Sequence, residues 1–286
     1  MSYARPDSLV TTAWVEEHIG DPKVLVVEVD VDTNAFEEGH VPGALAWNWT
    51  TQLCDRHLRD ILPRAQLEEL LRASGVEAST TIVLYGDNNN WFAAWALWQL
   101  EMYGHKDVRL MNGGRTKWLA EGRTLSLDVP ARTRTGYVVP AIDEAQRIEL
   151  DRLRPLVATG AIHLVDVRSP GEYSGEILSP PGLPETCQRG GHIPGAASVP
   201  WATACNPDGT FKSREELETI YGGKGVRDDK PIVAYCRIGE RSSHTWFVLR
   251  HLLGRKDVMN YDGSWTEWGS LIGVPIEKAV AVAAPR

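Results

Sequence analysis

The stretch VAYCRIGERSS, residues 233–243, places a cysteine directly after an apolar run and surrounds it with charged side chains. Cys236 is followed at once by Arg237 and five positions later by Arg241. The thiolate form of a cysteine is the nucleophile, and nearby cationic groups favour it over the thiol. This combination is typical of a reactive thiol. A simple packing cysteine would leave the crowded charged turn behind it unexplained.

The apolar run before Cys236 indicates a strand that ends at Tyr235. Residues 236–241 then form a strand-to-helix loop, and Ser242 or Ser243 is expected to cap the helix that follows. Free N–H groups at a helix N-terminus carry about half a positive charge. We therefore expect the helix and the arginines together to lower the pKa of the thiol.

The same loop can hold an anion, because consecutive backbone N–H groups curled around one point form a cradle for negative charge. We expect Glu240 to pair with an arginine, and the loop's shape to depend on Ile238, Gly239, Glu240 and Ser242. Two reactions suit such a site: phosphoryl transfer through a cysteinyl phosphate, and sulfur transfer through a cysteine persulfide. The spacing Cys-x4-Arg is one residue shorter than the Cys-x5-Arg of cysteine phosphatases. The tighter ring favours a single sulfur atom over a tetrahedral phosphate.

The segments around this loop occur twice in the chain. Residues 81–118 and 231–268 align at a constant offset of 150, which matches Tyr85 to Tyr235 and Gly86 to Cys236. Two further pairs share the same order, GHVPGALAWNW with GHIPGAASVPW at an offset of 152, and VLVVEVD with IHLVDVR at an offset of 138. The difference between these two offsets predicts a 14-residue insertion in the second copy.

Two copies of this length predict two similar domains, residues 1–125 and residues 146–286, with a linker at about 124–146. The insertion falls within residues 175–190. Since Gly86 stands where the second copy has its cysteine, we expect the N-terminal domain to be catalytically inactive and the C-terminal domain to be catalytic.

Short runs rich in Val, Ile and Leu alternate with amphipathic stretches in each copy. The runs are typical of strands buried on both faces, and they lie at 24–29, 81–85, 162–167 and 231–235. The stretches RAQLEELLRASG and SREELETIYGG predict helices, the second with a capping box between Ser213 and Glu216. This alternation predicts an α/β fold with two tandem domains, each an open, mostly parallel sheet flanked by helices. Ligands bind such sheets at the carboxyl ends of the strands, where Cys236 falls.

Composition narrows the function classes. The 286 residues carry a net charge of −8, which argues against binding to nucleic acid or to an anionic membrane. No apolar stretch approaches the length of a membrane span, and the start MSYARPDSLVTTAW lacks a secretory signal, so we expect a cytoplasmic protein. The other cysteines, Cys54, Cys187 and Cys205, have no paired spacing, which predicts neither a disulfide framework nor a metal site.

Four motifs together resemble those of the tandem-domain rhodaneses, the thiosulfate sulfurtransferases: DVRSPGEYSG at 166, GHIPGA at 191, CRIGERSS at 236 and DGSWTEW at 262. The resemblance extends over nearly the whole chain. It implies that both domains have the rhodanese fold and that no cofactor is needed. It also implies a ping-pong reaction in which Cys236 attacks the outer sulfur of thiosulfate and sulfite leaves. The resulting persulfide passes its sulfur to cyanide, to another thiophilic acceptor or to an acceptor protein.

The resemblance further implies that Arg168, at the end of the strand 162–167, binds the anionic donor. Arg237 is a second candidate for this role, and Arg241 either binds the donor or supports the loop through Glu240. Two arginines favour the thiosulfate dianion over the mercaptopyruvate monoanion. The histidines of the repeated motif, His40 and His192, are expected to be structural because they recur in the copy without the thiol. His244 is expected at the surface.

Three alternatives stay open at this point. The loop lacks both the lysine found two residues after the cysteine in animal thiosulfate sulfurtransferases, where Ile238 stands here, and the small residues of mercaptopyruvate sulfurtransferases. The chain could therefore be a 3-mercaptopyruvate sulfurtransferase, a non-catalytic sulfur carrier or regulatory module, or an enzyme of the phosphatase class. Cys187, in the inserted segment, could reach the site as a second thiol.

Overall fold

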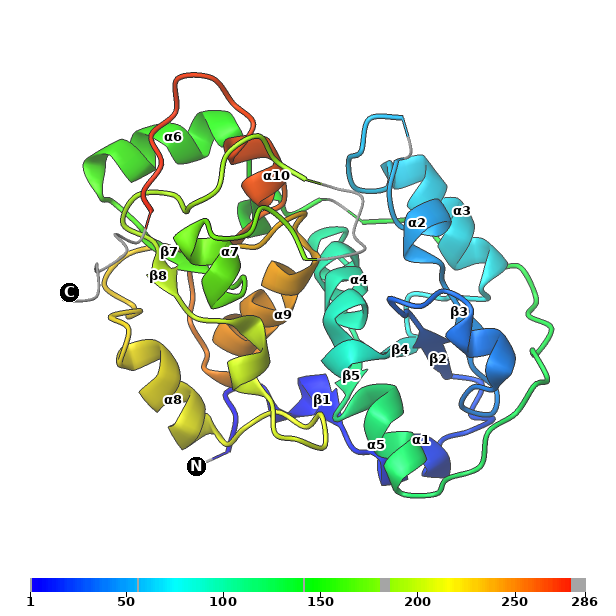
Figure 1. Ribbon diagram of the computed structural model, residues 1–286. Coiled ribbons are helices and arrows are strands. Elements are labelled where there is room, and N and C mark those ends of the chain that lie inside the picture. The colour runs from blue at the N-terminus through cyan, green and yellow to red at the C-terminus, as the bar shows by residue number, and fades with distance from the viewer. Residues whose placement is uncertain (1, 56, 141, 181–185, 279–286) are drawn as a thin grey trace. The chain divides into compact units, whose positions relative to one another are not determined.

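The computed structural model describes residues 2–55, 57–140, 142–180 and 186–278, so residues 181–185 of the predicted insertion lie outside the described residues. The chain divides into two compact units. The N-terminal unit comprises Ser2–Glu144 with Cys205–Lys212, and the C-terminal unit comprises Ala145–Ala204 with Ser213–Arg286. Each contains one sheet with helices packed on it (Figure 1).

The N-terminal unit has a parallel five-stranded sheet in the order β1-β5-β4-β2-β3. Its strands are β1 Leu9–Val10, β2 Val24–Glu28, β3 Leu45–Ala46, β4 Thr81–Tyr85 and β5 Val108–Met111. Its helices are α1 Thr12–Glu17, α2 Trp49–Gln52, α3 Arg64–Ala73, α4 Trp91–Met102 and α5 Gly114–Ala120. Three short 3-10 turns lie at Pro6–Ser8, Ala35–Glu38 and Asn88–Asn90.

The C-terminal unit repeats this topology in a parallel sheet of order β6-β10-β9-β7-β8. Its strands are β6 Arg147–Ile148, β7 His163–Asp166, β8 Ala197–Ser198, β9 Ile232–Tyr235 and β10 Val258–Tyr261. Its helices are α6 Leu150–Thr159, α7 Pro170–Ser174, α8 Arg214–Gly222, α9 Glu240–Phe247 with a π-helical continuation Val248–Leu252, and α10 Ser264–Trp268. Short 3-10 turns lie at Glu144–Gln146 and Trp201–Ala204. The predicted fold class, two tandem domains with open parallel sheets, is confirmed.

The strands that sequence analysis predicted as doubly buried are the central ones. Every residue of β2 and of β9 is buried, because helices cover both faces of each sheet. In the C-terminal unit α9 packs against β9 and β10. On the other face, side chains of α6 and α10 form one core with alternate strand residues, among them Val233 and Tyr235. The capping box of α8 is present as predicted, with Ser213 and Glu216 exchanging hydrogen bonds.

The repeated GH[VI]PGA motif braces each sheet in the same way. The backbone N–H of Val41 donates to the hydroxyl of Tyr85 at 3.0 Å, and that of Ile193 donates to the hydroxyl of Tyr235 at 3.1 Å. The tyrosine is the last residue of β4 in one unit and of β9 in the other. The motif thereby fixes the carboxyl end of the strand that leads into the cysteine loop. Within the described part of the chain, no helix combines the length and the apolar character needed to cross a membrane.

Candidate functional site

Cys236 lies at the carboxyl end of β9, directly after Tyr235, as the sequence predicted. Its side chain is fully buried. Its backbone N–H donates to Ser264 Oγ at 3.1 Å, and its carbonyl accepts the N–H of Trp265 at 3.2 Å. Both partners belong to α10, so the neighbouring strand-to-helix connection holds the cysteine in place.

The sulfur is contacted by the backbone of Gly239, by the carboxylate of Glu240 and by Ser242. The N–H of Gly239 donates to Cys236 Sγ at 3.1 Å, and Glu240 Oε2 lies 3.5 Å from the same sulfur. Gly239 has a φ of 95°, and a Cβ there would lie 2.3 Å from Asp262 Oδ1. Only glycine fits this position. The backbone conformation there directs the Gly239 N–H at the sulfur.

The helix after the loop begins earlier than predicted. α9 starts at Glu240 with Gly239 as its N-cap residue and with no side-chain cap, so the prediction that Ser242 or Ser243 caps it is wrong. Both serine hydroxyls instead donate to the carbonyl of Gly239, at 3.0 and 2.9 Å, and Asn260 Nδ2 donates to it at 2.9 Å. Three donors on one carbonyl fix the orientation of the glycine that faces the sulfur.

The expected depression of the thiol pKa is also wrong. Complete burial raises the pKa of Cys236, and the charge of Glu240 raises it further, while Arg241 and hydrogen bonds from Ser242 lower it only in part. Burial disfavours a charged sulfur more than the local cations favour it. The thiol form therefore prevails in the free protein.

Arg241 makes its ion pair with a residue that sequence analysis did not single out. Its two terminal nitrogens each donate to a carboxylate oxygen of Glu172 at 3.0 Å, and both side chains are buried. Glu172 also closes a capping box with Ser169 at the start of α7. The only sequence signal for Glu172 is the spacing Ser169-Pro170-x-Glu172, which predicts a capping box and not a partner for the loop.

Arg168 lies just beyond the carboxyl end of β7, where the resemblance placed it. Its guanidinium donates to both oxygens of Asp166, with the shortest distance 2.6 Å, and to the carbonyl of Gly191 at 2.7 Å. It lies over the ring of Trp265 and is 1% exposed. This geometry favours a role in holding the strand end over a role in binding the donor.

The two loop residues that directly follow Cys236 are both buried. Arg237 is buried, and its carbonyl accepts hydrogen bonds from the N–H and the hydroxyl of Thr266, both at 3.0 Å. Ile238 is buried as well. The loop is thus tied to α10 at Cys236 and at Arg237, which keeps its backbone in one conformation.

The histidines divide into two groups. His192 and His40 each bond a backbone carbonyl through Nδ1 and stack on an aromatic ring, Tyr173 and Phe36 respectively. This agrees with the structural role predicted for them. His244 is fully buried, where sequence analysis expected it at the surface, and burial lowers its pKa to about 3.

The matching loop of the N-terminal unit has no room for a nucleophile. A Cβ added to Gly86 would lie 2.1 Å from the carbonyl oxygen of Val29, which belongs to the backbone. The Gly86 N–H donates to Asn90 Oδ1 at 2.9 Å, and Asn90 Nδ2 donates to the carbonyl of Met111 at 2.8 Å. The side chain of Asn90 thus links the loop to the end of β5 by hydrogen bonds.

Gly86→Cys is expected to destabilise the N-terminal unit by at least about 2 kcal/mol, since the added side chain collides with backbone that cannot move aside. It should also add no reactive thiol. Urea unfolding measures the first effect, and alkylation of Gly86→Cys in a Cys236→Ala background measures the second. Gly136→Cys, where a Cβ meets nothing within 4 Å, is the matched control. A Gly86→Cys variant as stable as this control would contradict the expectation.

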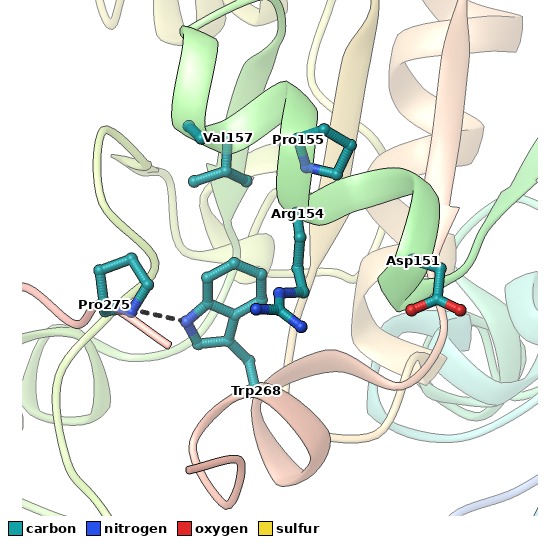
Figure 2. A pocket seen from close by; sticks show the side chains of 7 residues that line it. Asp151, Arg154, Pro155, Val157, Trp268 and Pro275 are labelled. Atoms are coloured by element: carbon teal, nitrogen blue, oxygen red, sulfur yellow. Dashed lines mark hydrogen bonds between the residues drawn. The ribbon is translucent and has the colours of Figure 1, made fainter. Parts of the chain in front are cut away.

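A pocket of about 440 Å³ lies elsewhere in the C-terminal unit, between α6 and the segment after α10 (Figure 2). Trp268 lines it and donates from Nε1 to the carbonyl of Pro275 at 2.9 Å, and Asp151 and Arg154 of α6 line it as well. None of the loop residues lines it, so it does not belong to the thiol site. Among the described residues no cluster of His, Cys, Asp and Glu could hold a metal ion.

Comparison with known proteins assigns the family. Residues 11–121 and 149–271 each match the rhodanese-like domain, so the chain belongs to the rhodanese-like family and carries its domain twice. It is 53% identical to "Sulfur carrier protein TtuD" of Thermus thermophilus, over 97% of this chain and 99% of that protein. It is 50% identical to "Putative thiosulfate sulfurtransferase" of Haloferax volcanii, over 96% of this chain and 98% of that protein.

Two solved structures are similar as well. An EanB variant carrying a cysteine persulfide, with ergothioneine, superposes with a TM-score of 0.82 at 28% identity, over 97% of this chain and 72% of that one. SseA of Escherichia coli, described as a 3-mercaptopyruvate sulfotransferase, superposes with a TM-score of 0.78 at 24% identity, over 90% of this chain and 98% of that one. The second likeness concerns the fold alone.

Proposed function

We propose that the protein is a thiosulfate sulfurtransferase that moves a sulfane sulfur from thiosulfate to a thiophilic acceptor, such as cyanide, through a persulfide on Cys236. The observation that carries this proposal is the position of one sulfur, at the end of β9, in contact with the Gly239 N–H at 3.1 Å. The relatives named "Putative thiosulfate sulfurtransferase", which are about half identical over nearly the whole chain, support the choice of donor.

The reaction balances in two steps. The Cys236 thiolate attacks the outer sulfur of thiosulfate, a new S–S bond forms, and sulfite leaves with the electron pair of the broken bond. The terminal sulfur of the persulfide then forms a bond to the acceptor carbon or sulfur, and the thiolate is released. Covalent catalysis replaces one difficult transfer with two easier ones. The Gly239 N–H stabilises negative charge at the sulfur in both steps.

Among the three arginines, Arg237 is the first candidate for binding the donor, ahead of Arg241 and Arg168. Arg241 and Arg168 each hold a buried carboxylate in a bidentate arrangement, with Glu172 and Asp166 respectively. Arg237 adjoins the thiol in the chain and adds a positive charge that suits a dianion. The N-terminal unit is proposed to be inactive, because its loop has Gly86 in place of the cysteine.

Mass spectrometry after exposure to thiosulfate tests the proposal. Cys236 should gain one sulfur atom, about 32 Da, and lose it again when cyanide is added. Parallel kinetics with 3-mercaptopyruvate separate the two donors: thiosulfate should give the higher kcat/KM. An unmodified Cys236 in folded protein would refute the persulfide, and a clear preference for mercaptopyruvate would refute the donor.

A second candidate function has its own support. TtuD, 53% identical, is named a sulfur carrier protein. We infer that the persulfide could also pass its sulfur to a protein thiol in place of cyanide. Persulfide-loaded protein incubated with a reduced acceptor protein, in the absence of cyanide, distinguishes the two uses by the mass of the acceptor.

A further inference from the structure

A buried carboxylate lies against the nucleophile. Glu240 Oε2 is 3.5 Å from Cys236 Sγ, a hydrogen-bonding distance for a thiol donor because sulfur is large. Both side chains are at most 3% exposed. Glu240 is the first residue of α9 and directly follows Gly239, whose N–H holds the same sulfur. The backbone therefore fixes the carboxylate relative to the thiol.

This arrangement poses a problem for a thiolate mechanism. If the thiol proton left for solvent, two negative charges would remain side by side in a site that excludes water, and burial alone already disfavours one of them. If the proton moved to Glu240, the pair would carry a single negative charge throughout. A carboxylate at this distance can accept the proton without any change of backbone.

We propose that Glu240 is a catalytic residue that takes the proton of the Cys236 thiol and holds it during sulfur transfer. This inference rests on the proposed sulfurtransferase function. The proton passes from Sγ to Oε2, the thiolate attacks the outer sulfur of thiosulfate, and sulfite leaves. When the acceptor removes the terminal sulfur, the thiolate is restored and the proton returns to it from Glu240. No proton is gained or lost over the cycle.

Glu240 is the carboxylate that lies against the sulfur, at 3.5 Å. Three other buried carboxylates are each bound to an arginine, Glu172 to Arg241, Asp166 to Arg168 and Asp262 to Arg147. Each of these carboxylates is thus already engaged by a guanidinium. Arg237 adds a further positive charge next to the thiol in the loop, and His244, on α9, is neutral because burial lowers its pKa to about 3.

Alkylation by iodoacetamide between pH 5 and pH 10 tests the proposal without any sulfur donor. Two groups that share a proton titrate as a pair. Wild-type protein should therefore show a plateau of thiol reactivity on the acid side and a second rise at alkaline pH. In Glu240→Gln, which keeps the size of the side chain, the plateau should vanish. We expect the rate at pH 6 to fall about 100-fold, the lower range of acid–base catalysis, and to recover above pH 9.

A faster alkylation of Glu240→Gln than of wild type would overturn the proposal. If Glu240 only repels the thiolate, its replacement by glutamine lowers the thiol pKa, and the variant reacts faster than wild type at every pH below the wild-type thiol pKa. Glu218→Gln, on α8 and paired with Arg255 at 2.6 Å, is the matched control and should leave the profile unchanged. If Glu240→Gln does not fold, the wild-type profile still decides, because a single sigmoidal titration contradicts a shared proton.

This test is separate from the test of sulfur transfer. A two-step alkylation profile in protein that forms no persulfide from thiosulfate would leave the role of Glu240 intact and refute the donor. A persulfide that forms normally in protein with a single-step profile would refute the role of Glu240 and leave the proposed donor intact.

Discussion

Cys236→Ser is expected to lower the formation of thiocyanate from thiosulfate and cyanide by at least about four orders of magnitude. Loss of a covalent nucleophile has effects of this size, because the groups around it act only on the intermediate that it forms. A serine oxygen keeps the hydrogen bond from Gly239 but cannot form a persulfide. Steady-state colorimetry of thiocyanate measures the loss, and circular dichroism checks that the variant is folded.

The other cysteines provide matched controls for this prediction. Cys54, half buried in the N-terminal unit, and Cys187, which donates to the carbonyl of Arg189 at 3.2 Å, should tolerate replacement with little change in turnover. Burial raises the pKa of Cys205 to about 12, which keeps that thiol protonated and unreactive. Turnover of folded Cys236→Ser within tenfold of wild type, or a comparable loss in Cys187→Ala, would show that another thiol carries the sulfur.

Arg241→Met is expected to destabilise the C-terminal unit by about 3–5 kcal/mol, because it leaves the buried carboxylate of Glu172 without its bidentate partner. The double variant Arg241→Met/Glu172→Gln should regain most of this loss, since a neutral glutamine needs no counter-ion and can still accept the N–H of Ser169. Urea unfolding of the two single variants and the double variant gives the coupling energy.

The same pair predicts a pH dependence with a definite sign. Burial raises the pKa of Glu172, but the ion pair with Arg241 outweighs it, so the pKa lies below its usual range. A carboxyl whose pKa is lower in the folded state stabilises the protein above its unfolded pKa, about 4.3, and loses this effect as the pH falls through its folded pKa. The stability gap between wild type and Arg241→Met should therefore narrow below about pH 4.

A more exposed arginine tests whether burial is the cause. Arg255 pairs with Glu218 at 2.6 Å and with Asp228 at 3.0 Å, both of which are more than a third exposed. Ion pairs of this kind contribute about 0–1 kcal/mol. If Arg255→Met and Arg241→Met cost the same, the buried geometry at Glu172 has no special importance.

Local sequence patterns were sufficient to predict the features that depend on residues close together in the chain. The strand that ends at Tyr235, the capping box of Ser213 and Glu216, and the glycine in place of a cysteine in the first copy follow from spacing and residue type. The alternation of apolar runs with amphipathic stretches made the parallel topology predictable. These features depend on neighbours a few residues apart.

Environment could not be predicted in the same way. The loop sequence has two arginines and suggests an electropositive site that lowers the thiol pKa, yet the tertiary structure buries Cys236 completely, and this reverses the sign of its pKa shift. His244 was misplaced for the same reason. Burial of a residue that follows a strand depends on which elements pack over it, and those elements come from distant parts of the chain.

The amino-acid sequence by itself determined the two-domain α/β architecture, the loop in which Cys236 follows a strand and precedes two arginines, and the lack of that cysteine in the first copy. Only the tertiary structure decided which charged groups lie in contact. It pairs Arg241 with Glu172 and Arg168 with Asp166, and it places the carboxylate of Glu240 against the sulfur. Charged partners are chosen by distance in space, and when water is excluded a few ångströms decide whether a group is paired, neutral or ready to take a proton.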